Sequence, residues 1–237
     1  MSALLGIIPA RSGSKGIPNK NIRYLGGNPL LQYTIDVAKK SKIFKDIILT
    51  TDSEKIKFIG KELGLNHTFI RPSKLAEDKT PMLPVIKHAI NEFKKDNYYP
   101  RYICILQPTS PFRRHEDLIK GYNTLINNDC DSVVSVAQVP DHYSPDFLMK
   151  IENNILKNFL EDGSNVTRRQ DATKAYARNG DFYFVKTDLV VNSDSIYGEV
   201  CVPSIIENQE SVNLDTMDDW YKAEKIILKR DKGKYEF

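Results

Sequence analysis

Cysteine is scarce in this chain, and its few residues lie far apart. The three cysteines, Cys104, Cys130 and Cys201, are odd in number and form no C-x-x-C pair. Neither a disulfide framework nor a zinc site built on paired cysteines is therefore expected. Reduced thiols suit a cytoplasmic protein, and the apolar surroundings of Cys104 and Cys201 predict that both are core residues.

Long apolar runs and strong net charge are also missing. No eighteen consecutive residues are apolar, and the first residues lack a basic segment before a long apolar run, so neither a membrane-spanning helix nor a signal peptide is expected. The net charge is +3 and no Lys/Arg tract exceeds two residues, which argues against nucleic acid or a membrane as partner. With 237 residues, of which 41% are hydrophobic, the chain can bury a core as a single domain, 1–237.

What is present is a regular alternation of strand-like and helix-like segments. The expected strands are Leu4–Ile8, Asp46–Thr51, His67–Ile70, Tyr102–Gln107 and Ser132–Val136. The expected helices between them are Leu30–Lys40, Glu54–Leu63, Pro84–Lys95 and Glu116–Asn127. This rhythm predicts an α/β fold with a mainly parallel central sheet and helices on both faces.

The alternation breaks near Pro140. The next segments predict a β-hairpin that turns at Asn153-Asn154, formed by Leu148–Ile151 and Ile155–Phe159. After a charged stretch, the pattern resumes with two strands and a closing helix: Asp181–Val185, Val200–Pro203 and Met217–Lys229. We interpret residues from about 140 to 175 as an inserted segment that serves dimer contacts or acts as a lid.

The most informative segment is the loop that follows the first strand. It reads P-A-R-S-G-S-K-G-I-P-N-K-N from Pro9 to Asn21, with two glycines and the cations Arg11, Lys15 and Lys20. Free backbone amides and cations at the carboxyl end of a strand predict a polyphosphate site, such as that of a nucleoside triphosphate. The loop fits neither G-x-x-x-x-G-K-[ST], because Gly16 follows Lys15, nor G-x-G-x-x-G, because Arg11 takes the first glycine position.

Three further segments are candidates for the same site. Gln107 follows an apolar strand and could read a base or ribose edge, although a proline-stiffened loop is an equal alternative. The run Arg168-Arg169-Gln170 offers arginine forks for phosphate or carboxylate, or is a charged surface loop. Asp215, ahead of the last helix, could hold Mg²⁺ or cap that helix.

Taken in order, these segments resemble the acylneuraminate cytidylyltransferases, the CMP-sialic acid or nonulosonic acid synthetase family. The matching motifs are I-I-P-A-R-S-G-S-K-G-I-P-N-K-N, L-Q-P-T-S-P-F-R, R-R-Q-D with Y-A-R-N-G-D-F-Y, and L-D-T-M-D-D-W. The resemblance spans nearly the whole chain. It implies a nucleotide-diphospho-sugar transferase-like fold, a homodimer with an exchanged hairpin, and a reaction that joins a 2-keto sugar acid to CTP with Mg²⁺, releasing pyrophosphate.

The resemblance also implies roles for individual residues. The nucleotide-binding positions would be Arg11, Ser14, Lys15, Gly16, Lys20, Asn21, Arg71 and Gln107. The catalytic positions would be Arg168, Arg169 and Gln170 together with Lys15, and Asp215 would hold the metal. Tyr176, Asn179 and Gly180 would line the sugar side.

This sequence departs from the family pattern at two places. Asn213 stands where many sialate enzymes have the first carboxylate of D-x-D, and the segment Asp141–Asp146 lacks the lysine that those relatives place there. Asp146 would repel a sugar carboxylate if it faced the site, so legionaminic or pseudaminic acid is at least as plausible a substrate as N-acetylneuraminate. The alternatives are a transferase using another nucleotide or a Kdo-like acid, and a non-catalytic nucleotide-binding relative.

Overall fold

A seven-stranded sheet forms the centre of the molecule. The computed structural model describes residues 3–160, 166, 168–207 and 212–232. The strand order is β11-β7-β10-β6-β1-β4-β5. The bounds are β1 (Leu4–Pro9), β4 (Asp46–Thr51), β5 (His67–Ile70), β6 (Tyr102–Ile105), β7 (Ser132–Gln138), β10 (Tyr176–Lys186) and β11 (Cys201–Ile205). Only β10 runs antiparallel to its neighbours β6 and β7, so the predicted mainly parallel α/β sheet is confirmed.

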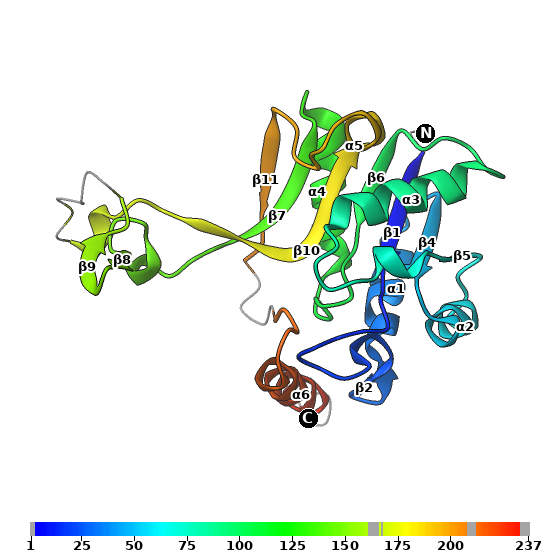
Figure 1. Cartoon of the computed structure of the whole chain (residues 1–237), viewed down its shortest axis with the longest axis horizontal. Coiled ribbons are helices and arrows are strands. Elements are labelled where there is room, and N and C mark those ends of the chain that lie inside the picture. Colours follow the sequence, from blue (N-terminus) through cyan, green and yellow to red (C-terminus); the bar gives the residue numbers. More distant parts are fainter. Residues whose placement is uncertain (1–2, 161–165, 167, 208–211, 233–237) are drawn as a thin grey trace.

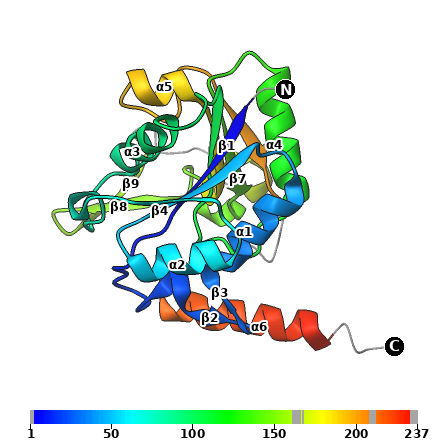
Figure 2. The same ribbon diagram turned by 90° about the vertical axis from the view of Figure 1, so that its right-hand side faces the viewer.

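Helices cover both faces of this sheet (Figures 1 and 2). Alternate residues of β1 point to opposite faces: Leu4 and Ile8 belong to one core cluster, and Leu5 and Ile7 to the other. The first cluster is closed by α1 (Leu30–Ser41), α2 (Glu54–Glu62) and α4 (His115–Asn127), and the second by α3 (Met82–Lys94) and α5 (Thr187–Asn192). Within the described ranges, no helix is both long enough and apolar enough to cross a bilayer.

A third, smaller core cluster supports the loop after β1. The last helix, α6 (Met217–Lys232), packs beside a short antiparallel pair, β2 (Tyr24–Leu25) and β3 (Asn28–Pro29), as Figure 2 shows. Trp220 of α6 is fully buried in this cluster with Ile17 and Leu214. The packing therefore places the residues just before α6 against the loop at the carboxyl end of β1.

An arm projects from the sheet between β7 and β10 (Figure 1). The chain leaves the sheet after Gln138 and returns at Tyr176, and the arm carries the hairpin β8 (Met149–Glu152) and β9 (Ile155–Asn158). Asn153 and Asn154, with φ of 52° and 61°, form its two-residue turn, as the sequence predicts. The arm also holds two one-turn 3-10 helices, η3 (Asp141–Tyr143) and η4 (Arg169–Asp171).

Several predicted boundaries were wrong. β10 begins at Tyr176 rather than Asp181, because its first residues are exposed and are held by pairing with β7 instead of by burial. α5 and the β2–β3 pair were not predicted, since each is too short to show a periodic pattern. Cys104 is buried as expected, but Cys201 is exposed because it opens β11, the edge strand of the sheet.

Candidate functional site

A cavity of about 420 Å³ opens at the carboxyl ends of β1, β5 and β6. The loops that follow these strands meet there because parallel strands end at the same edge of the sheet. The structure brings together in this cavity Arg11, Ser14, Lys15, Gly16, Lys20, Asn21, Arg71, Gln107 and Asp215. Thus every residue predicted to bind the nucleotide or the metal lines a single cavity.

The start of the loop after β1 is held in place by Asp52, which lies after β4, and by Asn21 at the end of the loop itself. Asp52, which follows β4, accepts hydrogen bonds from the Ser12 amide at 2.8 Å and from the Ser12 hydroxyl at 2.6 Å. Burial alone would raise the pKa of Asp52, but the Ser12 hydrogen bonds outweigh it and the pKa is lowered. Asn21 donates its amide to the Arg11 carbonyl at 2.8 Å, so in this structure its side chain orients the loop.

Gly16 makes the closest approach between this loop and the turn before α6. A Cβ atom built on Gly16 would lie 1.9 Å from the Asp215 carbonyl oxygen, so a side chain does not fit. Lys20 joins the same two segments, because its Nζ donates to the Leu214 carbonyl at 2.6 Å and lies 3.3 Å from Asp215 Oδ1. The cation loop and the predicted metal carboxylate are therefore held as one unit.

Asp78 is a cavity residue that the sequence did not reveal. It lies between η2 (Ser73–Leu75) and α3, where its carboxylate contacts Arg11 Nη1 at 2.7 Å and Lys15 Nζ at 2.8 Å. The hydrogen bond from Lys15, followed by that from Arg11, lowers the pKa of Asp78. Because 67 residues separate Asp78 from Arg11, no local motif could have linked them.

Two buried polar atoms of the cavity wall have no hydrogen-bond partner among the described residues. They are Nε of Arg71, a residue that is only 4% exposed, and Oγ1 of Thr109. Arg71 is anchored by Nη1, which donates to the Thr50 carbonyl at 3.2 Å, and burial lowers its pKa. Unpartnered buried donors are costly, and these two atoms have almost no accessible surface, so a ligand could reach them only if neighbouring side chains moved.

A buried arginine joins the Gln107 loop to the strand that carries the predicted sugar-side residues. Arg113 donates through Nη2 to the Gln107 carbonyl at 2.7 Å and through Nε to the Asp181 carbonyl. A Cβ on Gly180, whose φ is +78°, would lie 3.6 Å from Gln107 Oε1. Gly180 therefore lies beside the Gln107 loop, and the preceding Asn179 donates its Nδ2 to Asp181 at 2.9 Å; neither is among the residues that line the cavity.

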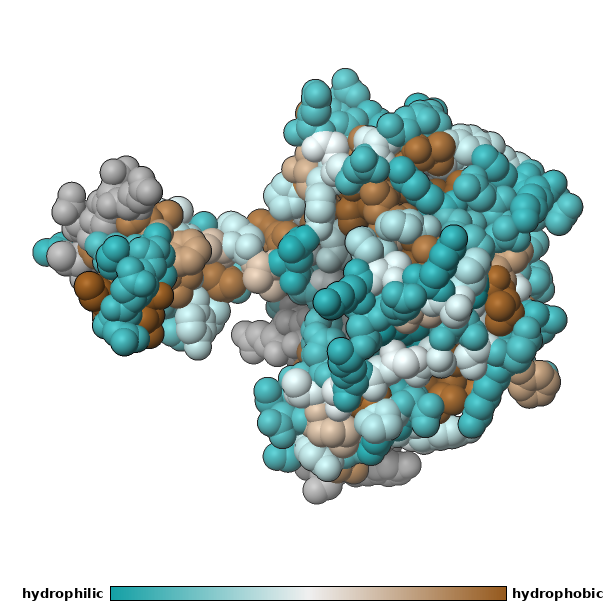
Figure 3. Space-filling view, viewed as in Figure 1, coloured by the Kyte–Doolittle hydropathy of each residue, from teal (hydrophilic) through white to brown (hydrophobic). Residues whose placement is uncertain are grey.

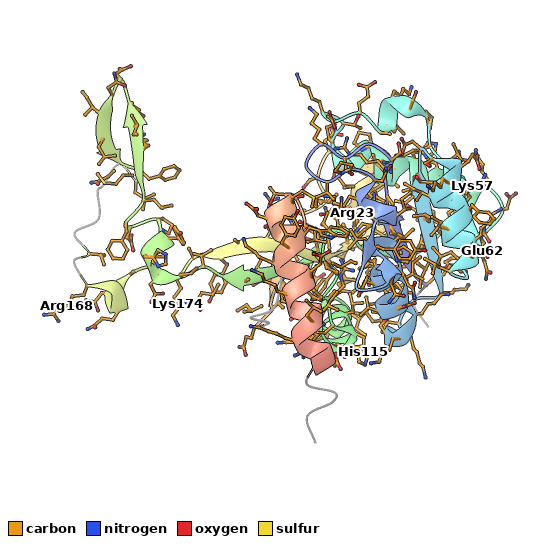
Figure 4. The ribbon with its side chains drawn as sticks, turned by 90° about the horizontal axis from the view of Figure 1, so that it is seen from below. Arg23, Lys57, Glu62, His115, Arg168 and Lys174 are labelled. Atoms are coloured by element: carbon orange, nitrogen blue, oxygen red, sulfur yellow. The ribbon has the colours of Figure 1, made fainter. Side chains whose placement is uncertain are left out.

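The remaining predicted residues lie on the arm. Arg168 is exposed on the arm, well away from the body of the molecule in Figure 4, and Arg169 and Gln170 lie next to it in η4. Tyr176 is 45% exposed and pairs with Gln138 where the arm joins the sheet. Within one chain, the structure therefore does not bring the R-R-Q segment or Tyr176 to the cavity that holds Lys15.

Asp215 offers one carboxylate to a magnesium ion shared with a substrate, and such an ion would have to displace the nitrogen donors that its oxygens contact here. Both carboxylate oxygens face polar groups, Lys20 Nζ at 3.3 Å and Asn213 Nδ2 at 2.9 Å, and the side chain is 63% exposed. The described residues contain no group of three or more His, Cys, Asp or Glu able to form a protein-only metal cage. Magnesium commonly takes one or two carboxylates plus substrate phosphate oxygens, which this arrangement allows.

Comparisons with known proteins show the family and the fold of this chain. A sequence profile described as cytidylyltransferase matches residues 5–226. The chain is 30% identical over 227 residues to the CMP-N,N'-diacetyllegionaminic acid synthase of Legionella pneumophila, covering 94% of this chain and 96% of that protein. It is 31% identical over 225 residues to a pseudaminic acid cytidylyltransferase of Campylobacter jejuni, covering 95% and 96%. The solved structure of a CMP:2-keto-3-deoxy-manno-octonic acid synthetase complexed with CTP shares the fold, with a TM-score of 0.72 at 13% identity, covering 97% of this chain and 100% of that one.

Proposed function

The chain belongs to the cytidylyltransferase family and is a nucleotidyltransferase, and from this membership we propose that it activates a nonulosonic acid with CTP, giving the CMP-sugar and pyrophosphate. The observation that carries the proposal is the gathering of Arg11, Lys15 and Lys20 in one cavity with Arg71 and Gln107. Three cations suit a triphosphate, and the Gln107 amide suits the edge of a base or ribose.

The proposed reaction needs positioning and charge neutralisation more than a side-chain nucleophile. The anomeric hydroxyl of the sugar acid attacks the α-phosphorus of CTP, and the bond between that phosphorus and the departing pyrophosphate breaks. Arg11 and Lys15 would stabilise the negative charge that develops on pyrophosphate. Asp52 and Asn21 hold the loop that carries these cations, so they would act through its position.

Asp215 is the residue that would hold Mg²⁺, and Asn213, whose Nδ2 donates to Asp215 in this structure, would have to turn its amide over to offer its oxygen as a neutral second ligand. A bound Mg²⁺ neutralises phosphate charge and polarises the phosphoryl group. Gly16 allows Asp215 to lie against the cation loop, so the metal carboxylate and the phosphate-binding cations face the same substrate.

For the sugar acid, we propose legionaminic and pseudaminic acid derivatives as the first candidates. The two relatives described above are named for these acids and match nearly the full length of this chain. We place the reaction in the cytoplasm, because Cys104, Cys130 and Cys201 are free thiols, as expected in a reducing compartment.

We further propose that 1–237 is a single domain that acts as a homodimer through its arm. One face of the hairpin is apolar and exposed, with Met149, Ile151 and Leu156, and the other carries Lys150, Glu152 and Lys157. Figure 3 shows hydrophobic residues exposed at the sides of the arm, next to hydrophilic residues in front. An isolated two-stranded hairpin is marginal in water, so this face is suited to pack on a second copy.

Packing on a second copy would also explain the position of the R-R-Q segment. An arm that reaches across a dimer could present Arg168 and Gln170 to the cavity of the other subunit. A mixture of Lys15→Ala and Arg168→Ala chains tests this directly. If the arm acts across the dimer, mixed dimers contain one intact site and recover activity; if each arm serves its own chain, mixing recovers none.

The proposed function is tested by measuring pyrophosphate release with CTP, Mg²⁺ and a panel of eight- and nine-carbon sugar acids. We expect release with CTP and at least one nonulosonic acid, and little with UTP, GTP or ATP. Arg11→Ala should abolish turnover while the protein keeps its circular dichroism spectrum. Absence of release with every acid on the panel would remove the proposal.

A further inference from the structure

The carboxylate of Asp78 forms ion pairs with two cations of the proposed triphosphate site, Arg11 and Lys15. It contacts Arg11 at 2.7 Å and Lys15 at 2.8 Å, one oxygen to each cation. Arg11 also reaches the Ala76 carbonyl at 3.4 Å, so two residues of this loop face the same guanidinium. The side chains of Arg11, Lys15 and Asp78 are 33%, 81% and 40% exposed, which leaves the contacts open to exchange.

A carboxylate and a phosphate group compete for the same hydrogen-bond donors on these cations. Each presents anionic oxygens that accept short, charge-assisted hydrogen bonds from guanidinium or ammonium donors. Lys15 and Arg11 cannot serve Asp78 and a phosphate group fully at the same time. A ligand that uses both cations must therefore displace Asp78, and Asp78 can pair with them again when that ligand leaves.

Glu77 shows that the pairing is specific to Asp78. Glu77 is the next residue in the chain and lines the same cavity. In the described part of the chain, no ion pair involves Glu77, whereas Asp78 makes two. The two carboxylates thus contribute equal charge to the cavity, and only one of them contacts the phosphate-binding cations.

We propose that Asp78 is a displaceable counter-ion of the phosphate site, which weakens the binding of CTP and promotes the release of pyrophosphate. This inference rests on the proposed function. Displacing Asp78 costs the same free energy for any ligand that contacts both cations, so Asp78 weakens the binding of CTP and of pyrophosphate by a similar factor. A ligand without phosphate, such as cytidine, leaves the ion pairs in place and is unaffected.

The test is isothermal titration of CTP, pyrophosphate and cytidine, with Mg²⁺ present, into wild type, Asp78→Asn and the matched control Glu77→Gln. Asparagine keeps the shape of Asp78 and removes its charge. Exposed ion pairs are weak, so we expect Asp78→Asn to tighten CTP and pyrophosphate about three- to tenfold more than Glu77→Gln does, with cytidine unchanged. Asp78→Ala provides a second variant should the first fail to fold.

The outcomes separate this inference from the proposed function. If wild type binds neither CTP nor pyrophosphate, the proposed function is wrong. If wild type binds both but Asp78→Asn binds them no more tightly than Glu77→Gln, Asp78 only helps to hold the cations in place and the inference is wrong. Equal tightening of cytidine would also overturn it, because the effect would then not act through Arg11 and Lys15.

Discussion

Replacing Gly16 with alanine should reduce activity severely although the change adds a single methyl group. A Cβ at this position would lie 1.9 Å from the Asp215 carbonyl oxygen, which belongs to the backbone and cannot rotate away. The loop and the turn before α6 must move apart by about 1.5 Å before that distance reaches the 3.4 Å of ordinary van der Waals contact.

The expected loss of activity depends on which groups this movement separates. It shifts the predicted metal carboxylate away from Lys15 and Lys20, and a misplacement of about 1 Å in an active site can lower the rate about a hundredfold. Overpacking of this kind costs about 1–3 kcal/mol of stability. We therefore expect Gly16→Ala to lose about a hundredfold or more in kcat/KM while its free energy of unfolding falls by only that amount.

Gly13→Ala is the matched control for this prediction. Gly13 lies in the same loop, and a Cβ built there meets no atom within 4 Å. Pyrophosphate release measures kcat/KM, and urea unfolding followed by the fluorescence of Trp220, the single tryptophan, measures stability. If Gly16→Ala is as active as Gly13→Ala, then close contact between the loop and the Asp215 turn does not matter for catalysis, and the reasoning fails.

Three other predictions concern the loop, the metal and the arm. Asp52→Asn should raise the KM for CTP, because it loosens Ser12. The folded-state pKa of Asp52 is lowered, so wild type should also lose its stability advantage over this variant as pH falls below about 3.8, which acid unfolding curves measure. Asp215→Asn should weaken Mn²⁺ binding measured by electron paramagnetic resonance, whereas unchanged binding would place the metal elsewhere. Ile151→Gln should shift the protein toward monomer in analytical ultracentrifugation, and Lys157→Gln, on the opposite face of the hairpin, should not; equal behaviour of the two would argue against the apolar face as the dimer contact.

Local features of the chain were predictable where short-range physics dominates. The apolar run predicted a strand at Leu4–Ile8, which the structure forms as Leu4–Pro9, and the glycines and cations that follow it predicted a loop able to bind polyphosphate. The β-hairpin was predictable from Asn153-Asn154, since asparagine tolerates the left-handed backbone that a two-residue turn requires. The start of β10 was not, because pairing with β7, rather than apolar alternation, holds Tyr176–Arg178 in place.

The parts of the site that depend on distant segments required the fold. Asp78 contacts Arg11, 67 positions away in the sequence, and Asp52 contacts Ser12, 40 positions away. Neither carboxylate belongs to a sequence motif from which its partner could be predicted. Arg113 was visible in the sequence as part of L-Q-P-T-S-P-F-R, but its burial and its contact with the Asp181 carbonyl were not.

The order of strands, helices and charged loops along this chain was enough to predict the α/β class and to single out residues that the structure gathers in one cavity, because periodicity and composition are local properties. The sheet then decides which of those residues meet. It gathers the carboxyl ends of β1, β5 and β6 at one edge, pairs Asp78 with the phosphate cations and presses Gly16 onto the Asp215 turn. It also carries Arg168 away on an arm, since β7 and β10 continue as a paired ribbon beyond the sheet. Such distances arise from packing between segments far apart in the chain, and no spacing within a motif encodes them.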